Sequence, residues 1–343
     1  MTETTEPAPP LDEEEPERRV PRWQRLVAGS VTEILVILVA MCVVFALLEP
    51  GAFATVNNVR NIATNAAILL VISVGMTFVI ITAGIDLSVG SVLVFSGVVA
   101  AKAMIAIGGD SWGVILIGLA VSLGCGLGWG LINGVLITKA RVPPLIVTLG
   151  TLGMALGFAL IITGGVDVRD VPFTLVDTIG VGRLFDQIPW LVIIAAGVAL
   201  VFGIVLHATR FGRHTYAIGS NDEAARRAGI NVDRHLIMVY GLAGLLAGLA
   251  GFMSLARFAT TTVGGHATDN LQAIAAVVLG GTSLFGGIGT VAGTVIGVFI
   301  PAVLQNGFVI VGVETFWRDV AVGAVLILAV YLDQLRRRSQ YRS

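Results

Sequence analysis

Long apolar runs recur along almost the whole chain, and they constrain its fold more than any other feature. A transmembrane helix needs about 20 predominantly apolar residues. Ten runs approach that length, so the sequence predicts an all-α, polytopic membrane protein with about ten transmembrane helices. The predicted spans are residues 31–49, 66–84, 87–107, 112–137, 145–164, 190–207, 236–257, 270–285, 288–307 and 317–334.

The composition agrees with a membrane protein and excludes an ordinary soluble domain. Hydrophobic residues make up 56% of the 343 residues, charged residues make up 13%, and the mean hydropathy is +0.92. The 43 glycines suit helices that pack closely inside a membrane. Very few residues separate spans two and three, or spans eight and nine, so each pair is either a tight hairpin or a pair of broken helices.

The basic residues divide unequally between the two sides of the predicted membrane. With the N-terminus in the cytoplasm, ten spans return the C-terminus to the cytoplasm, and the inner segments hold 15 of the 21 lysines and arginines. This division follows the positive-inside rule and sets the predicted orientation. The six basic residues expected outside are Arg60, Lys102, Arg169, Arg183, Arg257 and Arg318.

The same pattern divides the chain into three regions. Residues 1–27 are polar and are predicted to form a disordered cytoplasmic tail. Residues 28–335 form the predicted transmembrane domain, which includes a cytoplasmic connection at residues 208–235. Residues 336–343 form a basic cytoplasmic tail.

A carboxylate interrupts the apolar sequence at Asp86, within the segment Gly84-Ile85-Asp86-Leu87-Ser88-Val89-Gly90-Ser91. A charge at membrane depth is costly, so a functional role is the default hypothesis. One interpretation makes Asp86 the N-cap of a helix that begins at Leu87, with help from Ser88. The other places Asp86 on the translocation path near the cytoplasmic side as well. The path residues predicted here are Gly84, Asp86, Ser88 and Gly90.

A weak internal repeat links this segment to a second one about 200 residues later. Gly84-Ile85 and Gly90-Ser91-Val92 recur as Gly287-Ile288 and Gly293-Thr294-Val295, and Gly75-Met76-Thr77 recurs as Gly280-Gly281-Thr282. Glycine-interrupted helices in such repeats commonly line the substrate path of transporters. The alternative is a chance match between glycine-rich sequences. The repeat adds Thr282, Gly287 and Gly293 to the predicted path residues.

The connection at residues 208–235 contains the pattern of a short, self-contained helix. Its features are Ser220 or Asn221 as N-cap, Asp222 and Glu223 in the first turn, Arg226 and Arg227 in the last turn, and Gly229 after the end. Such a helix is either a plain capped loop helix or a surface element that a partner grips.

These segments resemble the membrane permeases of bacterial ABC importers of the ribose/xylose/autoinducer-2 type. Gly84–Ser91 is similar to a signature of that family, and residues 216–232 resemble its coupling loop. Residues 144–151 and 273–287 resemble two further family segments, and the resemblance covers about residues 55 to 333. The chain departs from the family pattern at Asn270-Leu271, where Glu-Leu is usual, and at Leu156-Gly157, where Arg-Gly is frequent.

The resemblance implies a permease subunit in the cytoplasmic (inner) membrane of a bacterium that translocates a ribose-like monosaccharide. It also implies three protein partners in addition to the lipid bilayer: a tandem-domain ABC ATPase, an extracytoplasmic solute-binding protein, and a second permease copy or paralogue. The ATPase would dock on the short cytoplasmic helix. The expected coupling residues are Asn221, Glu223, Ala224, Ala225 and Gly229.

Other function classes have less support in the sequence. An ion-coupled secondary transporter could use Asp86, and a membrane scaffold or receptor would leave both glycine-rich motifs unexplained. Both lysines, Lys102 and Lys139, precede alanine, so the chain has no P-loop and is not expected to be an enzyme. No nucleophile–base pair in a plausible site, metal-ligand motif or cofactor motif is evident. The net charge of −1 gives no reason to expect a nucleic-acid partner.

Overall fold

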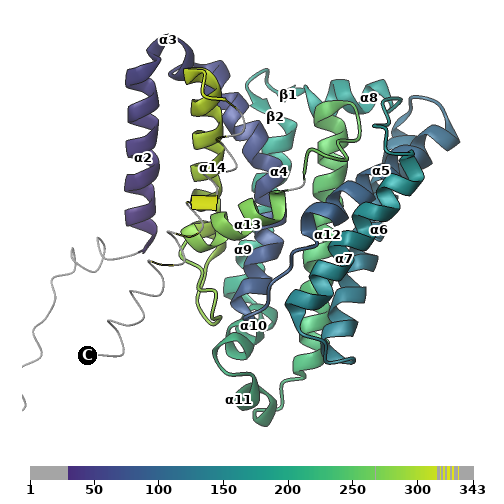
Figure 1. Cartoon of the computed structure of the whole chain (residues 1–343), viewed down its shortest axis with the longest axis vertical. Coiled ribbons are helices and arrows are strands. Elements are labelled where there is room, and N and C mark those ends of the chain that lie inside the picture. The colour runs from purple at the N-terminus through teal and green to yellow at the C-terminus, as the bar shows by residue number, and fades with distance from the viewer. Residues whose placement is uncertain are drawn as a thin grey trace, which may run out of the picture.

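The computed structural model describes residues 30–266 and 268–314, together with residues 317, 320, 323, 324, 327 and 331. The predicted tails, residues 1–27 and 336–343, and most of the predicted span 317–334 lie outside the described residues. The long helices run side by side, with α3, α8 and the β1–β2 hairpin at one end and α10 and α11 at the other (Figure 1).

The described part of the chain is almost entirely helical. The helices are α2 (Ser30–Leu48), α3 (Pro50–Phe53), α4 (Val56–Ile81), α5 (Val89–Ile107), α6 (Trp112–Thr138), α7 (Pro144–Thr163), α8 (Phe173–Leu175), α9 (Trp190–Ala208), α10 (Arg210–Ser220), α11 (Asp222–Arg227), α12 (Val232–Phe258), α13 (Asp269–Leu279) and α14 (Val291–Val311). A π-helical turn η1 (Val176–Gly180) precedes strands β1 (Arg183–Leu184) and β2 (Ile188–Pro189), which pair antiparallel.

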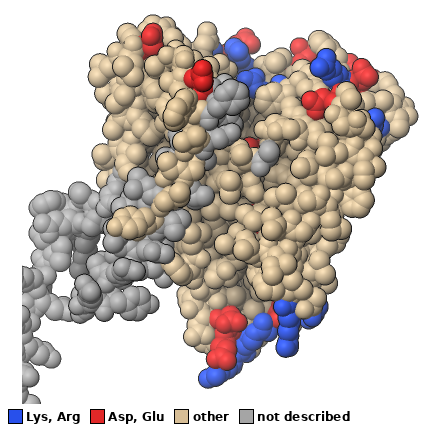
Figure 2. Space-filling view, viewed as in Figure 1, with Lys and Arg blue, Asp and Glu red and all other residues tan. Residues whose placement is uncertain are grey.

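Seven of the described helices are long and apolar enough to cross a membrane: α4, α5, α6, α7, α9, α12 and α14. This confirms an all-α, multi-pass membrane protein. The prediction of a full span at residues 270–285 is wrong, because α13 has only 11 residues. Such a helix is about 16 Å long, roughly half the hydrocarbon thickness. An uncharged belt of surface separates the charged groups at the two ends (Figure 2).

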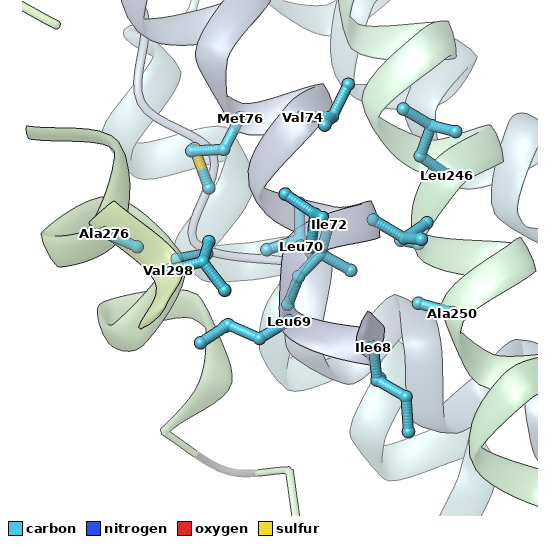
Figure 3. Close-up of a cluster of buried hydrophobic side chains, with 14 of the residues drawn as sticks. Ile68, Leu69, Leu70, Ile72, Val74, Met76, Leu246, Ala250, Ala276 and Val298 are labelled. Carbon is cyan, nitrogen blue, oxygen red and sulfur yellow. The ribbon is translucent and has the colours of Figure 1, made fainter. Parts of the chain in front are cut away.

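Helix α4 forms the centre of the bundle and begins ten residues before the predicted span. The hydroxyl of Thr55 accepts a hydrogen bond from Asn58 N–H at 3.2 Å, and this N-cap starts the helix in a polar stretch. Every residue from Ala66 to Ile81 is buried. Figure 3 shows α4 side chains between Leu246 and Ala250 on one side and Ala276 and Val298 on the other.

Helices α6 and α12 pack backbone against backbone through glycine. A Cβ on Gly126 would overlap the carbonyl of Gly244, and one on Gly248 would overlap the carbonyl of Ser122. The hydroxyl of Ser122 donates to the Gly248 carbonyl at 2.8 Å. These contacts are typical of membrane helices, where small residues allow close approach.

Helices α5 and α14 begin partway through the bundle. We call residues 82–88, which join α4 to α5, the first linker, and residues 280–290, which join α13 to α14, the second linker. The first linker rises from the lower end of α4 to the middle of the bundle, and the second dips towards α10 before α14 begins (Figure 1). Of the helices that flank the two linkers, α4, α5 and α14 are long enough to cross a membrane and α13 is not, so the broken-helix alternative describes the segment of spans eight and nine. The predicted helix starts at 87 and 288 are corrected to Val89 and Val291.

Candidate translocation and coupling site

The two linkers, which carry the repeated motifs, meet inside the bundle. Gly287 N–H donates to the carbonyl of Ile81, the last residue of α4, at 2.9 Å. The hydroxyls of Thr77 on α4 and Thr294 on α14 lie 2.7 Å apart, and both side chains are fully buried. The predicted repeat therefore places its two copies in direct contact.

Asp86 in the first linker is almost fully buried, at 1% exposure. Its Oδ1 accepts hydrogen bonds from Ser88 N–H at 2.8 Å and from Ser88 Oγ at 2.6 Å. Asn133 of α6 donates to Ser88 Oγ at 2.9 Å, and Asn270 of α13 donates to the Leu87 carbonyl at 3.0 Å. These bonds attach the start of α5 to two neighbouring helices.

The prediction that Asp86 is the N-cap of a helix beginning at Leu87 is wrong in position. Helix α5 begins at Val89, and Ser88 is its N-cap residue. Asp86 lies two residues further out and bonds the backbone of Ser88 in an Asx-turn. The carboxylate thus fixes the capping residue instead of capping the helix directly.

The second linker achieves a similar helix start with uncharged groups. The hydroxyl of Thr290 accepts a hydrogen bond from Gly293 N–H at 2.9 Å and caps α14. Thr282 is 1% exposed, and a Cβ on Gly293 would overlap the Gly280 carbonyl. All seven predicted path residues are buried or half-buried within the single chain. Their place on a substrate path therefore remains a prediction.

Helix α11 has the capped structure that the sequence predicts. Asn221 Oδ1 accepts from Ala224 N–H at 2.9 Å, so Asn221 is the N-cap rather than Ser220. Gly229 has a left-handed φ of +85°, and its N–H donates to the Arg226 carbonyl at 3.0 Å. Ile230 N–H donates to the Ala225 carbonyl at 3.1 Å, which completes a Schellman motif.

The two alanines of α11 face in different directions. Ala224 is exposed, whereas Ala225 is 4% exposed and packs with Ile218 and Val232. At the same end, Asp233 accepts from Arg226 at 2.8 Å and from Lys139 at 3.3 Å. The carboxylate of Asp233 thus partly neutralises the charge of Arg226 in α11 and of Lys139 beside it.

Helix α10 is an element that the sequence analysis did not predict. A Cβ on Gly219 would overlap the Ile81 carbonyl and would lie 2.6 Å from Gly287 N. Tyr216 Oη donates to the Gly289 carbonyl at 2.6 Å. Burial raises the pKa of the Tyr216 phenol, so it remains a neutral donor at physiological pH. Helix α10 therefore touches the end of α4 and the second linker directly.

The signal that could have revealed α10 is local. Thr209 is an N-cap whose hydroxyl accepts from Gly212 N–H at 3.4 Å. Thr215 and Ile218 lie three residues apart, on the buried face of the helix.

A buried Ser–His–Asp chain was also missed. Ser254 Oγ lies 2.8 Å from His266 Nε2, and His266 Nδ1 lies 2.6 Å from Asp269 Oδ2. The three side chains lie in the order of a catalytic triad, and both Ser254 and His266 are buried. Ser254 is 4% exposed on α12, and the chain of bonds ties α12 to the start of α13. Among the described residues, no group of three His, Cys, Asp or Glu side chains could hold a metal ion.

Comparison with known proteins places this arrangement in a family. The chain is 39% identical over 307 residues to the ribose import permease protein RbsC of Escherichia coli (strain K12), covering 88% of this chain and 93% of that protein. It is 41% identical over 299 residues to RbsC of Bacillus subtilis (strain 168), covering 86% and 89%. It is 37% identical over 302 residues to the D-allose transport system permease protein AlsC of Escherichia coli (strain K12), covering 88% and 90%. No solved structure matches the chain.

A family model described as "Branched-chain amino acid transport system / permease component" matches residues 58–330. That match includes both linkers, α10 and α11, and the relatives are named as permeases, not as enzymes. The chain therefore belongs to this family of transport permeases, in its ribose-type branch.

Proposed function

We propose that the chain is the permease subunit of an ABC importer and translocates a ribose-like monosaccharide across the cytoplasmic (inner) membrane of a bacterium. The observation that carries this proposal is the identity of 37–41% to permeases named for ribose and allose, over nearly the whole chain. Because these relatives are all named as permeases of import or transport systems, the ion-coupled alternative built on Asp86 is not supported.

The α11 end is the surface on which the ATPase subunit docks. Helix α11 satisfies its own ends, so its shape does not depend on a partner. Glu223 and Ala224 are exposed there, and the small Ala224 permits close approach of a groove. Asn221 and Gly229 hold the helix ends, and Ala225 packs it onto the chain. The four coupling residues besides Ala224 thus act by presenting and supporting this surface.

Movement of α11 reaches the membrane through α10. Helix α10 runs directly into α11 and contacts both Ile81 and the second linker through Gly219 and Tyr216. ATP-driven closure of a tandem-domain ATPase would shift α10, and the second linker would follow. The path opens when the linkers separate, exposing Asp86, Ser88 and Thr282, whose polar atoms hydrogen-bond passing sugar hydroxyls. A second permease copy or paralogue completes the path, and a solute-binding protein delivers the sugar outside.

Reconstitution tests this function. The permease, its ATPase and its solute-binding protein are placed in proteoliposomes, and uptake of radiolabelled ribose, allose and fructose is measured. ATP-dependent uptake of at least one of these sugars is expected. Uptake that needs a proton gradient but not ATP would contradict the proposal and restore the ion-coupled alternative.

The variant Gly229→Val tests the docking surface. A β-branched residue at a left-handed position is strained by about 1–2 kcal/mol, so the end of α11 should unwind locally. ATPase association and uptake should fall together while membrane insertion survives. The matched control is Gly124→Val on α6, where the backbone is helical and a Cβ meets nothing within 4 Å. Normal ATPase stimulation by Gly229→Val would refute the docking assignment.

A further inference from the structure

Two arginines follow directly after the end of a lipid-facing helix, α9. This helix runs from Trp190 to Ala208, and its 19 residues are roughly 29 Å long, close to the hydrocarbon thickness of a bilayer. Arg210 and Arg213 come next, in the first turns of α10. The positive-inside rule predicts this end to be cytoplasmic. The length of α9 therefore places both arginines just beyond the hydrocarbon, at the depth of the lipid headgroups.

Tight packing holds the start of α10 at this depth. A Cβ on Gly212 would overlap the carbonyl of Leu206, so glycine allows α10 to fold back against the last turn of α9. The rings of His207 and Tyr216 stack with their centroids 6.3 Å apart. Helix α10 therefore begins beside the end of α9, whereas α11 lies farther from the bundle (Figure 1).

The charges of Arg210 and Arg213 are unpaired. The two residues lie three positions apart, so they share one side of the helix, and both are exposed. No ion pair in the described part of the chain involves either arginine. The sequence from 187 to 221 contains no Asp or Glu, so no carboxylate close in sequence can neutralise them.

The basic residues around α11 differ in this respect. Arg226 and Lys139 share the carboxylate of Asp233, and Arg227 pairs with Glu223. The charges of these three residues are thus balanced within the chain, whereas the start of α10 presents a net positive surface at the membrane boundary.

An apolar stripe on α9 leads to the same place. Leu200, Val201 and Ile204 are each more than half exposed, and His207 and Ala208 continue the exposed side to the end of the helix. In a bilayer such a surface contacts acyl chains, which are as apolar as the leucine side chain. The stripe and the arginines together match a molecule with an apolar tail and an anionic head.

The chemistry of the arginines selects a phosphate. A guanidinium group presents N–H donors in a planar fork that matches phosphate oxygens, and basic residues beside the end of a membrane helix attract anionic lipid headgroups. We propose that Arg210 and Arg213 bind the phosphate of an anionic phospholipid whose acyl chains lie along Leu200 and Ile204. A carboxylate of the ATPase would have to reach past α11 to the membrane boundary, so the geometry favours the lipid.

A bound lipid would give α10 one fixed end. Tyr216 and Gly219, which contact the second linker, lie about 9 and 14 Å along the helix from Arg210. Movement of α11 would then turn α10 about its lipid-held start and displace the linker. This consequence rests on the proposed function, whereas the lipid site itself does not.

Thermal unfolding in nanodiscs tests the site without sugar transport. Wild-type and Arg210→Gln/Arg213→Gln permeases are placed in phosphatidylcholine alone or in phosphatidylcholine mixed with phosphatidylglycerol. One control is Arg227→Gln, which removes a paired charge from α11. The other is Arg169→Gln, which removes an exposed charge from the loop at the opposite end. Because Arg210 and Arg213 are exposed, the double variant should have the wild-type Tm in phosphatidylcholine.

Phosphatidylglycerol is expected to raise the Tm of the wild type and of both controls by about 3 °C or more, because a ligand that binds only the folded state stabilises it. The rise in the double variant should be less than half as large. An equal rise in the wild type and the double variant overturns the proposal, and so does the absence of a rise in the wild type.

Two further measurements separate the lipid from other anions. Inorganic phosphate added to phosphatidylcholine nanodiscs should leave the Tm of the wild type unchanged; a rise that the double variant loses means a free-anion site and overturns the lipid assignment. ATPase association should be the same for the wild type and the double variant in phosphatidylcholine. If the double variant loses association there, the arginines contact the ATPase, and the proposal is wrong. An importer that transports no sugar would refute the proposed function and leave the lipid result intact.

Discussion

The first and second linkers begin alike. Two residues after the end of α4, Ala83 lies in the left-handed region at φ 59°, and two residues after the end of α13, Gly281 does so at φ 86°. In both cases the next N–H donates back to the helix, from Gly84 to Val79 at 3.0 Å and from Thr282 to Val277 at 3.2 Å. The same Schellman ending thus stops both helices inside the bundle.

The two linkers differ in what holds them. The first is fixed to membrane helices, since Asp86 and Ser88 connect to Asn133 of α6 and Leu87 connects to Asn270 of α13. The second is capped by its own Thr290 and is held from below by α10. From this difference we expect the first linker to be the stationary half of the proposed site, and the second linker to be the half that follows α10 and α11.

The largest effect is expected from Gly219→Val, which separates α10 from the end of α4 and from the second linker. A side chain at this position would overlap the Ile81 carbonyl and approach Gly287 N, and neither is a flexible group. Helix α10 must therefore move away, and the Ile81–Gly287 contact is lost with it. Uptake should be abolished in a reconstituted importer.

The matched control is Gly197→Val on α9, where a Cβ meets nothing within 4 Å. This variant makes the same Gly→Val change in helix propensity but causes no steric overlap, so it should transport normally. If Gly219→Val supports normal uptake, the linkers do not depend on α10, and the contrast drawn between them is incorrect.

A smaller effect is expected at Asp86, in the stationary half. Asp86→Leu leaves the buried Ser88 N–H and hydroxyl without their acceptor, which should lower stability by about 1–3 kcal/mol. Asp86→Asn keeps an acceptor oxygen and should be nearly silent if the carboxylate only holds the start of α5. Thermal unfolding in detergent and uptake are measured together. Loss of uptake in a stable Asp86→Asn protein would show that the charge itself is needed.

Features set by neighbouring residues could be predicted from the sequence. The caps of α11 depend on Asn221 and Gly229 together with residues within a few positions of them; Gly229 was predicted as the C-terminal cap, and Asn221 was one of two N-cap alternatives with Ser220. The long spans were found because apolar runs of that length have few alternatives. The start of α4 was placed too late, because Asn57, Asn58 and Arg60 make its first turns polar.

Features that depend on tertiary contact could not be predicted. The end of α13 is a different case, because Gly280 and Gly281 directly follow Leu279 and are a local stop signal that the predicted span 270–285 passed over. The partners of Gly219 lie 138 and 68 positions away, at Ile81 and Gly287. Similarly, Ser254 and His266 belong to different elements and meet only because the connection after α12 folds back.

The smallest effect is expected from Tyr216→Phe, which removes one bond between α10 and the second linker. The phenol donates to the Gly289 carbonyl at 2.6 Å, and a net hydrogen bond contributes about 0.5–1.5 kcal/mol. The ring remains, so folding and ATPase docking should be unaffected. The sugar transported per ATP hydrolysed should fall by about two- to tenfold, because α10 can then move without drawing the linker along. Ser220→Ala is the control, since that exposed hydroxyl bonds the Tyr216 carbonyl within its own helix at 2.9 Å. An unchanged transport ratio in Tyr216→Phe would mean that steric contact at Gly219 alone couples the second linker to α10.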